Sequence, residues 1–121
     1  MILFSDAEWT VLEVLWQKDT FCLGEVVDAL KPLTNWSRNT VHTYLTRMEA
    51  KQAVVIDRSG EPHQYSAAVS REQCARSERS KLLDKVYRGA AGDLIAAFLK
   101  ESKISAEERE HLRGLLDDMD V

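Results

Sequence analysis

Amide, hydroxyl, imidazole and guanidinium groups recur through residues 35–49, NWSRNTVHTYLTRME, where Val41, Leu45 and Met48 also stand at helical spacing. On a helical wheel these three apolar residues share one face, and most of the polar residues fall opposite. An amide can pair with adenine, a guanidinium with guanine, and a threonine methyl can contact thymine. The stretch therefore predicts a helix that reads DNA. The residues expected to contact DNA are Ser37, Arg38, Asn39, Thr40, His42, Thr43, Thr46, Arg47, Lys51 and Arg58.

The elements around this helix favour DNA binding over a merely solvated polar face, which is the commoner role of such a face. Apolar periodicity predicts helices over residues 6–18, 23–30 and 37–51. Two β-prone segments follow within residues 53–69, separated by the turn residues Gly60-Glu61-Pro62. Three helices and a hairpin in this order are typical of a winged helix-turn-helix domain. The second hypothesis is a winged helix that serves as a protein–protein interaction module without specific DNA binding.

The rest of the chain is predicted to be helical. Capping boxes, in which a serine and a residue three positions later satisfy each other's amide groups, occur at Ser5, Ser70 and Ser105. Breaks are expected around Gly89-Ala90-Ala91-Gly92 and near residues 102–105. We therefore expect a mostly α (α+β) fold. It comprises a winged helix-turn-helix DNA-binding domain at 1–69 and a helical dimerisation domain at 70–121.

Three apolar stripes in this second domain predict a homodimer, because so thin a helical segment cannot bury them alone. A second copy of the chain could cover them, and a two-fold dimer would present two reading helices to successive half-sites. The alternative is an ordinary intramolecular bundle packed on the first domain. The expected interface residues are Leu82, Leu83, Val86, Tyr87, Leu94, Ile95, Phe98, Leu99, Leu112, Leu115 and Leu116, with Met119 beside them.

Composition excludes several other classes of protein. The 121 residues carry a net charge of −4 and include only two cysteines, Cys22 and Cys74, which stand far apart without a CxxC motif. This pattern argues against a disulfide framework and a zinc site. We find no motif for catalysis, so we expect no enzyme activity, no metal and no cofactor. The N-terminal residues form neither a basic leader nor a long apolar run, so we expect a cytoplasmic protein without membrane insertion.

The chain carries SDAEWTVLEVLW at residues 5–16, NWSRNTVHTYLTRMEAKQAV at 35–54 and DKVYRGAAGDLIAAFLK at 84–100. In order and over nearly the whole chain, these segments resemble the penicillinase and methicillin-resistance repressors, the BlaI/MecI family. The resemblance implies a homodimeric transcriptional repressor that binds palindromic double-stranded operator DNA, with half-sites of the TACA and TGTA type. By position, the residues expected to contact DNA fall on that family's recognition helix, with Arg58 on its wing.

The resemblance also raises a question of regulation. In relatives that respond to β-lactams, a membrane sensor protease system cuts the dimerisation domain at an Asn-Phe or Asn-Ile bond. The matching bond here joins Ala97 to Phe98, so the asparagine is absent. Copper-responsive relatives end in a pair of CxC motifs, whereas this chain ends in LLDDMDV. The resemblance therefore leaves open which signal releases this protein from DNA, including whether a sensor protease is a partner.

Overall fold

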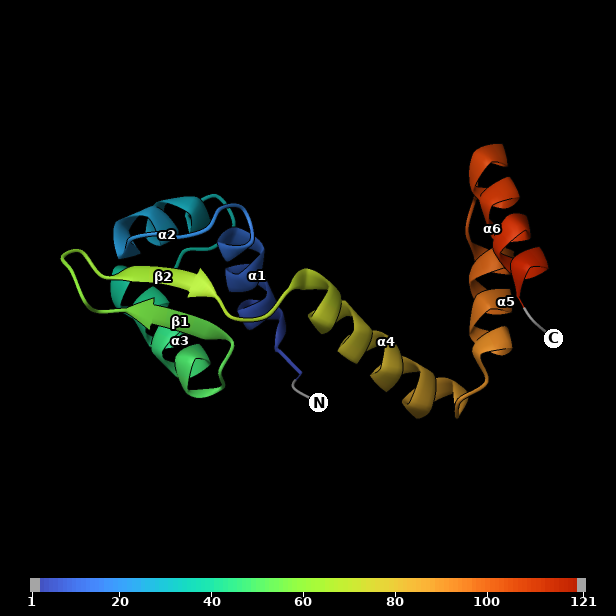
Figure 1. Ribbon diagram of the computed structural model, residues 1–121, viewed down its shortest axis with the longest axis horizontal. Helices are drawn as coiled ribbons and strands as arrows, with labels where there is room; N and C mark the ends of the chain where they lie inside the picture. The colour runs from blue at the N-terminus through green and yellow to red at the C-terminus, as the bar shows by residue number, and fades with distance from the viewer. Residues whose placement is uncertain (1–2, 120–121) are drawn as a thin grey trace. The chain divides into compact units, whose positions relative to one another are not determined.

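The computed structural model describes residues 3–119, which form six helices and one antiparallel pair of strands (Figure 1). Contacts divide the chain into two compact units, one ending at Arg79 and the other beginning at Ser80. The predicted mostly helical α+β fold is confirmed. The elements are α1 (Asp6–Leu15), α2 (Leu23–Leu30), α3 (Arg38–Ala50), β1 (Val54–Asp57), β2 (Gln64–Ala67), α4 (Arg71–Tyr87), α5 (Ala91–Glu101) and α6 (Ala106–Asp118).

Serine side chains cap the starts of α1, α3, α4 and α6, and all three predicted capping boxes are confirmed. At the start of α1, Ser5 Oγ accepts from the Glu8 amide at 3.2 Å and Glu8 Oε1 accepts from the Ser5 amide at 2.9 Å. The same exchange occurs between Ser70 and Gln73 and between Ser105 and Glu108. Each exchange satisfies amide groups that the first turn of a helix leaves without partners.

One apolar core holds α1, α2, α3 and the hairpin together in the first unit (Figure 1). Its largest side chains, all less than 2% exposed, come from the inner faces of the three helices. Val41, Leu45 and Met48 have no exposed surface, so the predicted inner face of α3 is confirmed. The β1–β2 pair joins Ile56 to Tyr65 and Val54 to Ala67, and it adds Val54, Ile56 and Tyr65 to the core. Burial of one side of α3 leaves its other side to solvent.

Helix α3 is ended by a residue in the left-handed backbone conformation. This residue is a glutamine, so the sequence does not mark the position with a glycine. Gln52 has φ of 65°, and its amide donates to the carbonyl of Glu49 at 2.9 Å. The next amide, that of Ala53, donates to the carbonyl of Met48, also at 2.9 Å. These two bonds define a Schellman motif, in which glycine is the usual left-handed residue. The motif ends the helix and turns the chain directly into β1.

The first helix is shorter than predicted, because it ends at Leu15 and not at residue 18. Beyond Trp16, which caps the end of the helix, the chain must turn to bring Phe21 beside the hairpin. The Phe21 amide donates to the Tyr65 carbonyl at 2.9 Å, and the Tyr65 amide donates to the Phe21 carbonyl at 2.7 Å. This isolated bridge adds a third backbone segment to the hairpin, a pairing that the sequence analysis missed.

The second unit consists of the end of α4 with α5 and α6. The predicted break between α4 and α5 is confirmed at Gly89, whose φ of 85° suits glycine and whose amide donates to the Leu83 carbonyl at 3.1 Å. Among residues 80–119, none is buried. Within the described part of the chain, no helix is both long enough and apolar enough to span a bilayer.

Candidate nucleic-acid interface

The solvent face of α3 carries most of the residues that the sequence singles out for DNA contact. Arg38, Asn39, His42 and Arg47 are exposed on it, and Thr40, Thr43 and Thr46 are partly exposed. Ser37 caps the helix by accepting from the Thr40 amide at 3.1 Å, and its hydroxyl donates to Thr40 Oγ1 at 3.0 Å. A single rigid helix therefore presents this predicted set together, with its opposite face fixed by the core.

The hydroxyl protons of two threonines on this face are already used within the helix. Thr43 Oγ1 donates to the Asn39 carbonyl at 3.0 Å, and Thr46 Oγ1 donates to the Thr43 carbonyl at 3.0 Å. A threonine bound in this way offers a partner its methyl group and the remaining lone pair of its oxygen. These two side chains are thus suited to contact a thymine methyl or to accept from a base amino group.

Arg38 and Arg47 are the free cations of α3. Within residues 3–119, neither guanidinium lies within ion-pair distance of a carboxylate. Arg38 also borders a hollow of about 410 Å³ between α2, α3 and the hairpin loop. His42 of α3 and His63 of the loop both line this hollow, with Glu61 beside them. The loop that follows β1 therefore adjoins the exposed face of α3, a proximity that the sequence alone did not show.

Lys51, expected to contact DNA, forms an ion pair inside the protein. Its Nζ lies 2.6 Å from Glu8 Oε2 and 5.8 Å from the centre of the Phe4 ring. The Glu8 side chain is only 10% exposed, whereas that of Lys51 is 44% exposed. Burial acts to raise the pKa of Glu8, but the Lys51 ammonium and the Ser5 amide outweigh it and hold that pKa below its ordinary value. Lys51 thereby joins the end of α3 to the start of α1.

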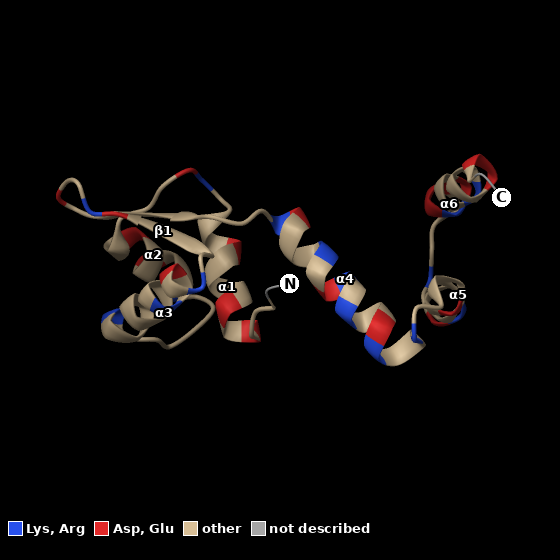
Figure 2. Ribbon diagram, turned by 60° about the horizontal axis from the view of Figure 1, so that its bottom comes forward, with Lys and Arg blue, Asp and Glu red and all other residues tan. Residues whose placement is uncertain are grey.

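Arg58, expected on the wing, is held against α3 by Glu49, the single acid on that helix (Figure 2). Arg58 Nη1 donates to Glu49 Oε2 at 2.7 Å, and Nη2 donates to Oε1 at 2.9 Å. This two-pronged pair lowers the pKa of Glu49 through its hydrogen bonds to the guanidinium. A phosphate that binds Arg58 must therefore compete with Glu49. The sequence analysis assigned no role to Glu49.

Tryptophans support the elements that carry the interface. Trp36, just before α3, stacks on Tyr44 with ring centres 4.7 Å apart and planes 27° from parallel. Trp9 of α1 and Trp16, which caps the end of that helix, meet edge to face with ring centres 5.6 Å apart. All three pack against the core. They serve as anchors of the fold, which agrees with the expectation that aromatic residues with a polar edge lie partly buried.

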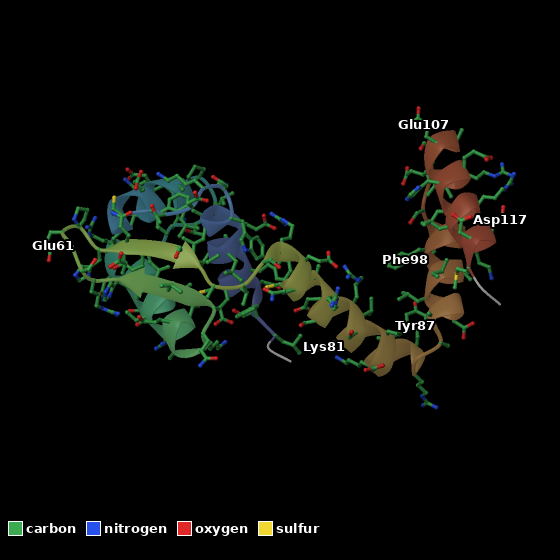
Figure 3. All side chains as sticks on the ribbon, viewed as in Figure 1. Glu61, Lys81, Tyr87, Phe98, Glu107 and Asp117 are labelled. Atoms are coloured by element: carbon green, nitrogen blue, oxygen red, sulfur yellow. The ribbon has the colours of Figure 1, made fainter. Side chains whose placement is uncertain are left out.

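Many of the apolar residues predicted to form the dimer interface lie exposed in the second unit. Phe98 projects outward from α5 (Figure 3) and is 56% exposed, and Val86 and Leu116 are each 57% exposed. Leu83, Tyr87, Leu94 and Leu112 are partly buried within the unit. A hollow of about 330 Å³ is lined by residues of α5, α6 and the segment between them. The exposed large apolar residues of this unit are Leu82, Val86, Ile95, Phe98, Leu99, Ile104, Leu115, Leu116 and Met119.

The bond that matches the cleavage position of the resembled family lies inside a helix. Ala97 is partly buried and Phe98 is exposed, and both belong to α5 (Ala91–Glu101). Proteases cleave extended backbone, so a cut here requires local unwinding of α5. Cleavage at this bond stays a prediction.

The described residues offer no group of three or more His, Cys, Asp or Glu side chains arranged to hold a metal ion. Cys22 is half-buried at the start of α2, Cys74 is buried in α4, and neither forms a disulfide. Burial raises the pKa of the Cys74 thiol, which disfavours the reactive thiolate.

Comparison with known proteins gives one consistent result. The family model described as penicillinase repressor matches residues 4–118. The chain is 26% identical over 113 residues to the methicillin resistance regulatory protein MecI of Staphylococcus aureus strain N315, covering 93% of this chain and 92% of that protein. It is 27% identical over 115 residues to a penicillinase repressor of Staphylococcus aureus, covering 95% of this chain and 91% of that one.

A solved structure is similar as well. The solution structure of monomeric Bacillus licheniformis BlaI in complex with the blaP half-operator matches with a TM-score of 0.52 and 28% identity. The match covers 59% of this chain and 87% of the other.

Proposed function

The chain belongs to the penicillinase repressor family of DNA-binding transcriptional regulators, and from this membership we propose a sequence-specific repressor that binds a palindromic operator as a homodimer. The similar BlaI structure is a protein–DNA complex with a half-operator. The second half of an operator would take a second copy. We place this activity in the cytoplasm, where the operator DNA is.

The observation that carries the proposal is the two-sided character of α3. Its inner face is fully buried through Val41, Leu45 and Met48. Its outer face groups amide, imidazole, threonine and free guanidinium side chains on one rigid element. A helix that enters the major groove needs both properties, since it must be held firmly and must present short polar groups to base edges. Asn39, His42, Thr43 and Thr46 would then read bases.

Arg38 and Arg47 are the proposed first contacts to phosphate. They carry no competing carboxylate among the described residues, whereas Lys51 and Arg58 are paired with Glu8 and Glu49. Phosphate contacts by paired cations cost the separation of an existing pair, so they contribute less to affinity. Arg38 and Arg47 should therefore contribute more to phosphate binding than Lys51 and Arg58.

The proposed dimer rests on the exposed apolar residues of the second unit. Phe98, Leu115 and Leu116 are each more than half exposed, and a monomer would leave them in water. Dimerisation also places the second α3 at high effective concentration near its half-site. The proposal includes control of a β-lactam-resistance-like or stress operon, with a membrane sensor protease system as a partner.

The proposal is tested by selecting bound sequences from random DNA with the purified protein. We expect an enriched inverted repeat, and binding that weakens with salt at a log–log slope of about −0.9 for each phosphate neutralised. No enrichment, together with binding that ignores salt and a protein partner retained in pull-downs, would favour the protein-binding module instead.

Two variants at one position then test base readout. Thr43→Val keeps the methyl group and removes the hydroxyl, whereas Thr43→Ser keeps the hydroxyl and removes the methyl. If Thr43 contacts a thymine methyl, the serine variant should lose about 1–3 kcal/mol on the selected site and little on random DNA. Equal losses of affinity on the selected site and on random DNA would show that Thr43 does not read a base.

A further inference from the structure

One hollow of the first unit gathers a guanidinium and two imidazoles from separate elements. It has a volume of about 410 Å³ and lies between the start of α2, the start of α3 and the hairpin loop. Arg38 and His42 line it from α3, and His63 lines it from the loop. All of its lining residues belong to the first unit. Cys22, Glu61 and Tyr65 bring further titratable groups to it, and Leu23, Gly24 and Pro62 complete its lining.

The guanidinium and the imidazoles are available to a ligand. Within the described part of the chain, neither Arg38 nor His42 lies within ion-pair distance of a carboxylate. An ideal Cβ atom on Gly24 would lie 3.8 Å from Arg38 Nη1, so the guanidinium lies beside the first turn of α2. His63 Nε2 is 3.8 Å from Glu61 Oε1, which is beyond hydrogen-bond distance.

The acids near the hollow do little to neutralise these cations. Glu61 lies at the tip of the hairpin loop (Figure 3), and its side chain is 91% exposed. Glu25 of α2 is bound to Lys18 at 2.6 Å. The pKa of Asp57, at the end of β1, is lowered first by hydrogen bonds from Ser59 and to a smaller extent by the charge of His63. The hollow therefore lacks an anion that would hold Arg38 and both imidazoles at once.

We propose that this hollow binds a phosphate group of the operator backbone and that binding is coupled to proton uptake by His42 and His63. The proposal rests on the proposed function and adds His63 to the residues that contact DNA. Arg38 supplies a permanent positive charge, and an imidazole that takes up a proton from solvent donates from both ring nitrogens instead of one. In the free protein Arg38 disfavours that second charge, and a bound phosphate favours it.

The position of the hollow favours DNA as the source of the phosphate. A helix in the major groove lies between two phosphate backbones, so groups at its flank meet phosphate while its outer face meets bases. The hollow lies at such a flank, where α3 adjoins α2 and the hairpin loop. Arg38 and His42 lie next to the reading face that includes Asn39 and Thr43. The same docking would therefore bring bases to that face and a phosphate to the hollow.

The coupling fixes the sign of a pH dependence. An opposite charge within ~4–6 Å favours the charged form of a titratable group by about tenfold or more. Protonated imidazoles therefore strengthen binding, and affinity should be highest near pH 6 and fall towards pH 8, the range in which histidine side chains change charge. One coupled histidine gives a change of about tenfold over this range, and two give more.

The test measures DNA binding by the full-length protein at constant salt between pH 6 and 8. Random DNA is used beside the selected operator, because phosphate contacts do not depend on sequence. Calorimetry in buffers of different ionisation enthalpy counts the protons taken up. For the wild type we expect affinity to fall about tenfold or more from pH 6 to pH 8, with roughly one proton taken up per protomer near pH 7.

Histidine variants assign the protons. His63→Gln should reduce proton uptake by about half and lower affinity at pH 6 equally on both DNAs. Replacement of both His42 and His63 by glutamine should abolish the uptake. The matched control is His111→Gln, because the chain has three histidines and this one lies on α6 in the second unit. It should keep the wild-type uptake and pH profile.

Glu61→Gln gives a change of opposite sign. It removes the only carboxylate among the described residues that line the hollow, so affinity at pH 7 should rise about two- to threefold on both DNAs. A folding defect would not produce such a gain, and circular dichroism checks that every variant is folded at each pH. Weaker binding by Glu61→Gln would contradict a phosphate in the hollow.

Inorganic phosphate tests the other source of the same chemistry. It is titrated into the protein against sodium chloride of equal ionic strength, while the imidazole proton signals of the three histidines are followed by NMR. We expect phosphate and chloride to act alike. If phosphate alone shifts the signals of His42 and His63 and displaces DNA, the hollow takes a free anion and its assignment to the DNA backbone is wrong.

The remaining outcomes separate this inference from the proposed function. If the wild type binds DNA without proton uptake, or if His111→Gln removes as much uptake as His63→Gln, the coupling is wrong and the repressor stands. If the wild type binds neither DNA at any pH, the proposed function fails as well, and that failure is visible without any variant.

Discussion

Replacement of Lys51 should destabilise the fold, because this side chain is the charged partner of a nearly buried carboxylate. Its Nζ lies 2.6 Å from Glu8 Oε2, and the Glu8 side chain is only 10% exposed. A hydrogen bond between charged groups contributes ~1.5–3 kcal/mol to the free energy of unfolding. Because the Lys51 side chain is 44% exposed, solvent screening reduces this contribution to about 1–2 kcal/mol. Lys51→Ala should therefore lower the melting temperature by roughly 4–16 °C at neutral pH.

The loss of stability caused by Lys51→Ala should become smaller as the pH falls. The pKa of Glu8 in the folded protein lies below its ordinary value of 4.5, since the Lys51 ammonium and the Ser5 amide outweigh the effect of burial. A carboxylate with a lowered pKa contributes stability that is present above its unfolded pKa and is lost as pH falls through the folded pKa. The gap between wild type and Lys51→Ala should thus narrow as pH falls below about 4.5.

The assay is thermal unfolding followed by circular dichroism between pH 3 and 8, in Lys51→Ala, Glu8→Gln and the double variant. Glutamine can still accept from the Ser5 amide but carries no charge, so Lys51→Ala should cost about 1 kcal/mol less in that background. An equal cost in both backgrounds, or a gap that persists at low pH, would refute the reasoning. DNA affinity of Lys51→Ala, measured well below its melting temperature, then reports any separate contact to phosphate.

Three further predictions concern the core, the wing and the dimer. Leu45→Ala should cost ~2–5 kcal/mol in urea unfolding, because this side chain has no exposed surface; a loss below ~1 kcal/mol would contradict its place in the core. Glu49→Gln should free Arg58 from its carboxylate partner and steepen the salt dependence on random DNA by about one unit of slope. An unchanged slope would mean that Arg58 does not reach phosphate. Phe98→Asp should shift the protein to monomer in sedimentation equilibrium, because this exposed residue is proposed to lie in the dimer interface. An unaltered dimer would show that Phe98 is not part of the interface.

Local patterns in the sequence were sufficient to predict most elements of the fold. The capping boxes at Ser5, Ser70 and Ser105 all form as predicted, because a cap depends on residues three positions apart. The two faces of α3 follow equally from helical periodicity, which fixes which side chains share a face once one face is buried.

Features that join distant residues could not be predicted in this way. The sequence placed Lys51 and Arg58 among the residues expected to contact DNA, and it gave no sign that Glu8 and Glu49 would hold them, across 43 and 9 residues respectively. The backbone bridge between Phe21 and Tyr65 and the contact between Arg71 and Glu13 have the same character. Each depends on which surfaces the core brings together.

The sequence by itself thus determined the kind of protein: which helix presents polar groups, where helices begin, and which helices carry apolar stripes. These properties are periodic or local, so they are encoded within a few neighbouring residues. Only the tertiary structure decided which cations of the first unit are free and that Arg71 of α4 meets Glu13 of α1. Charges separated along the chain meet only after folding, and their distances then decide whether a guanidinium is available to phosphate or already bound.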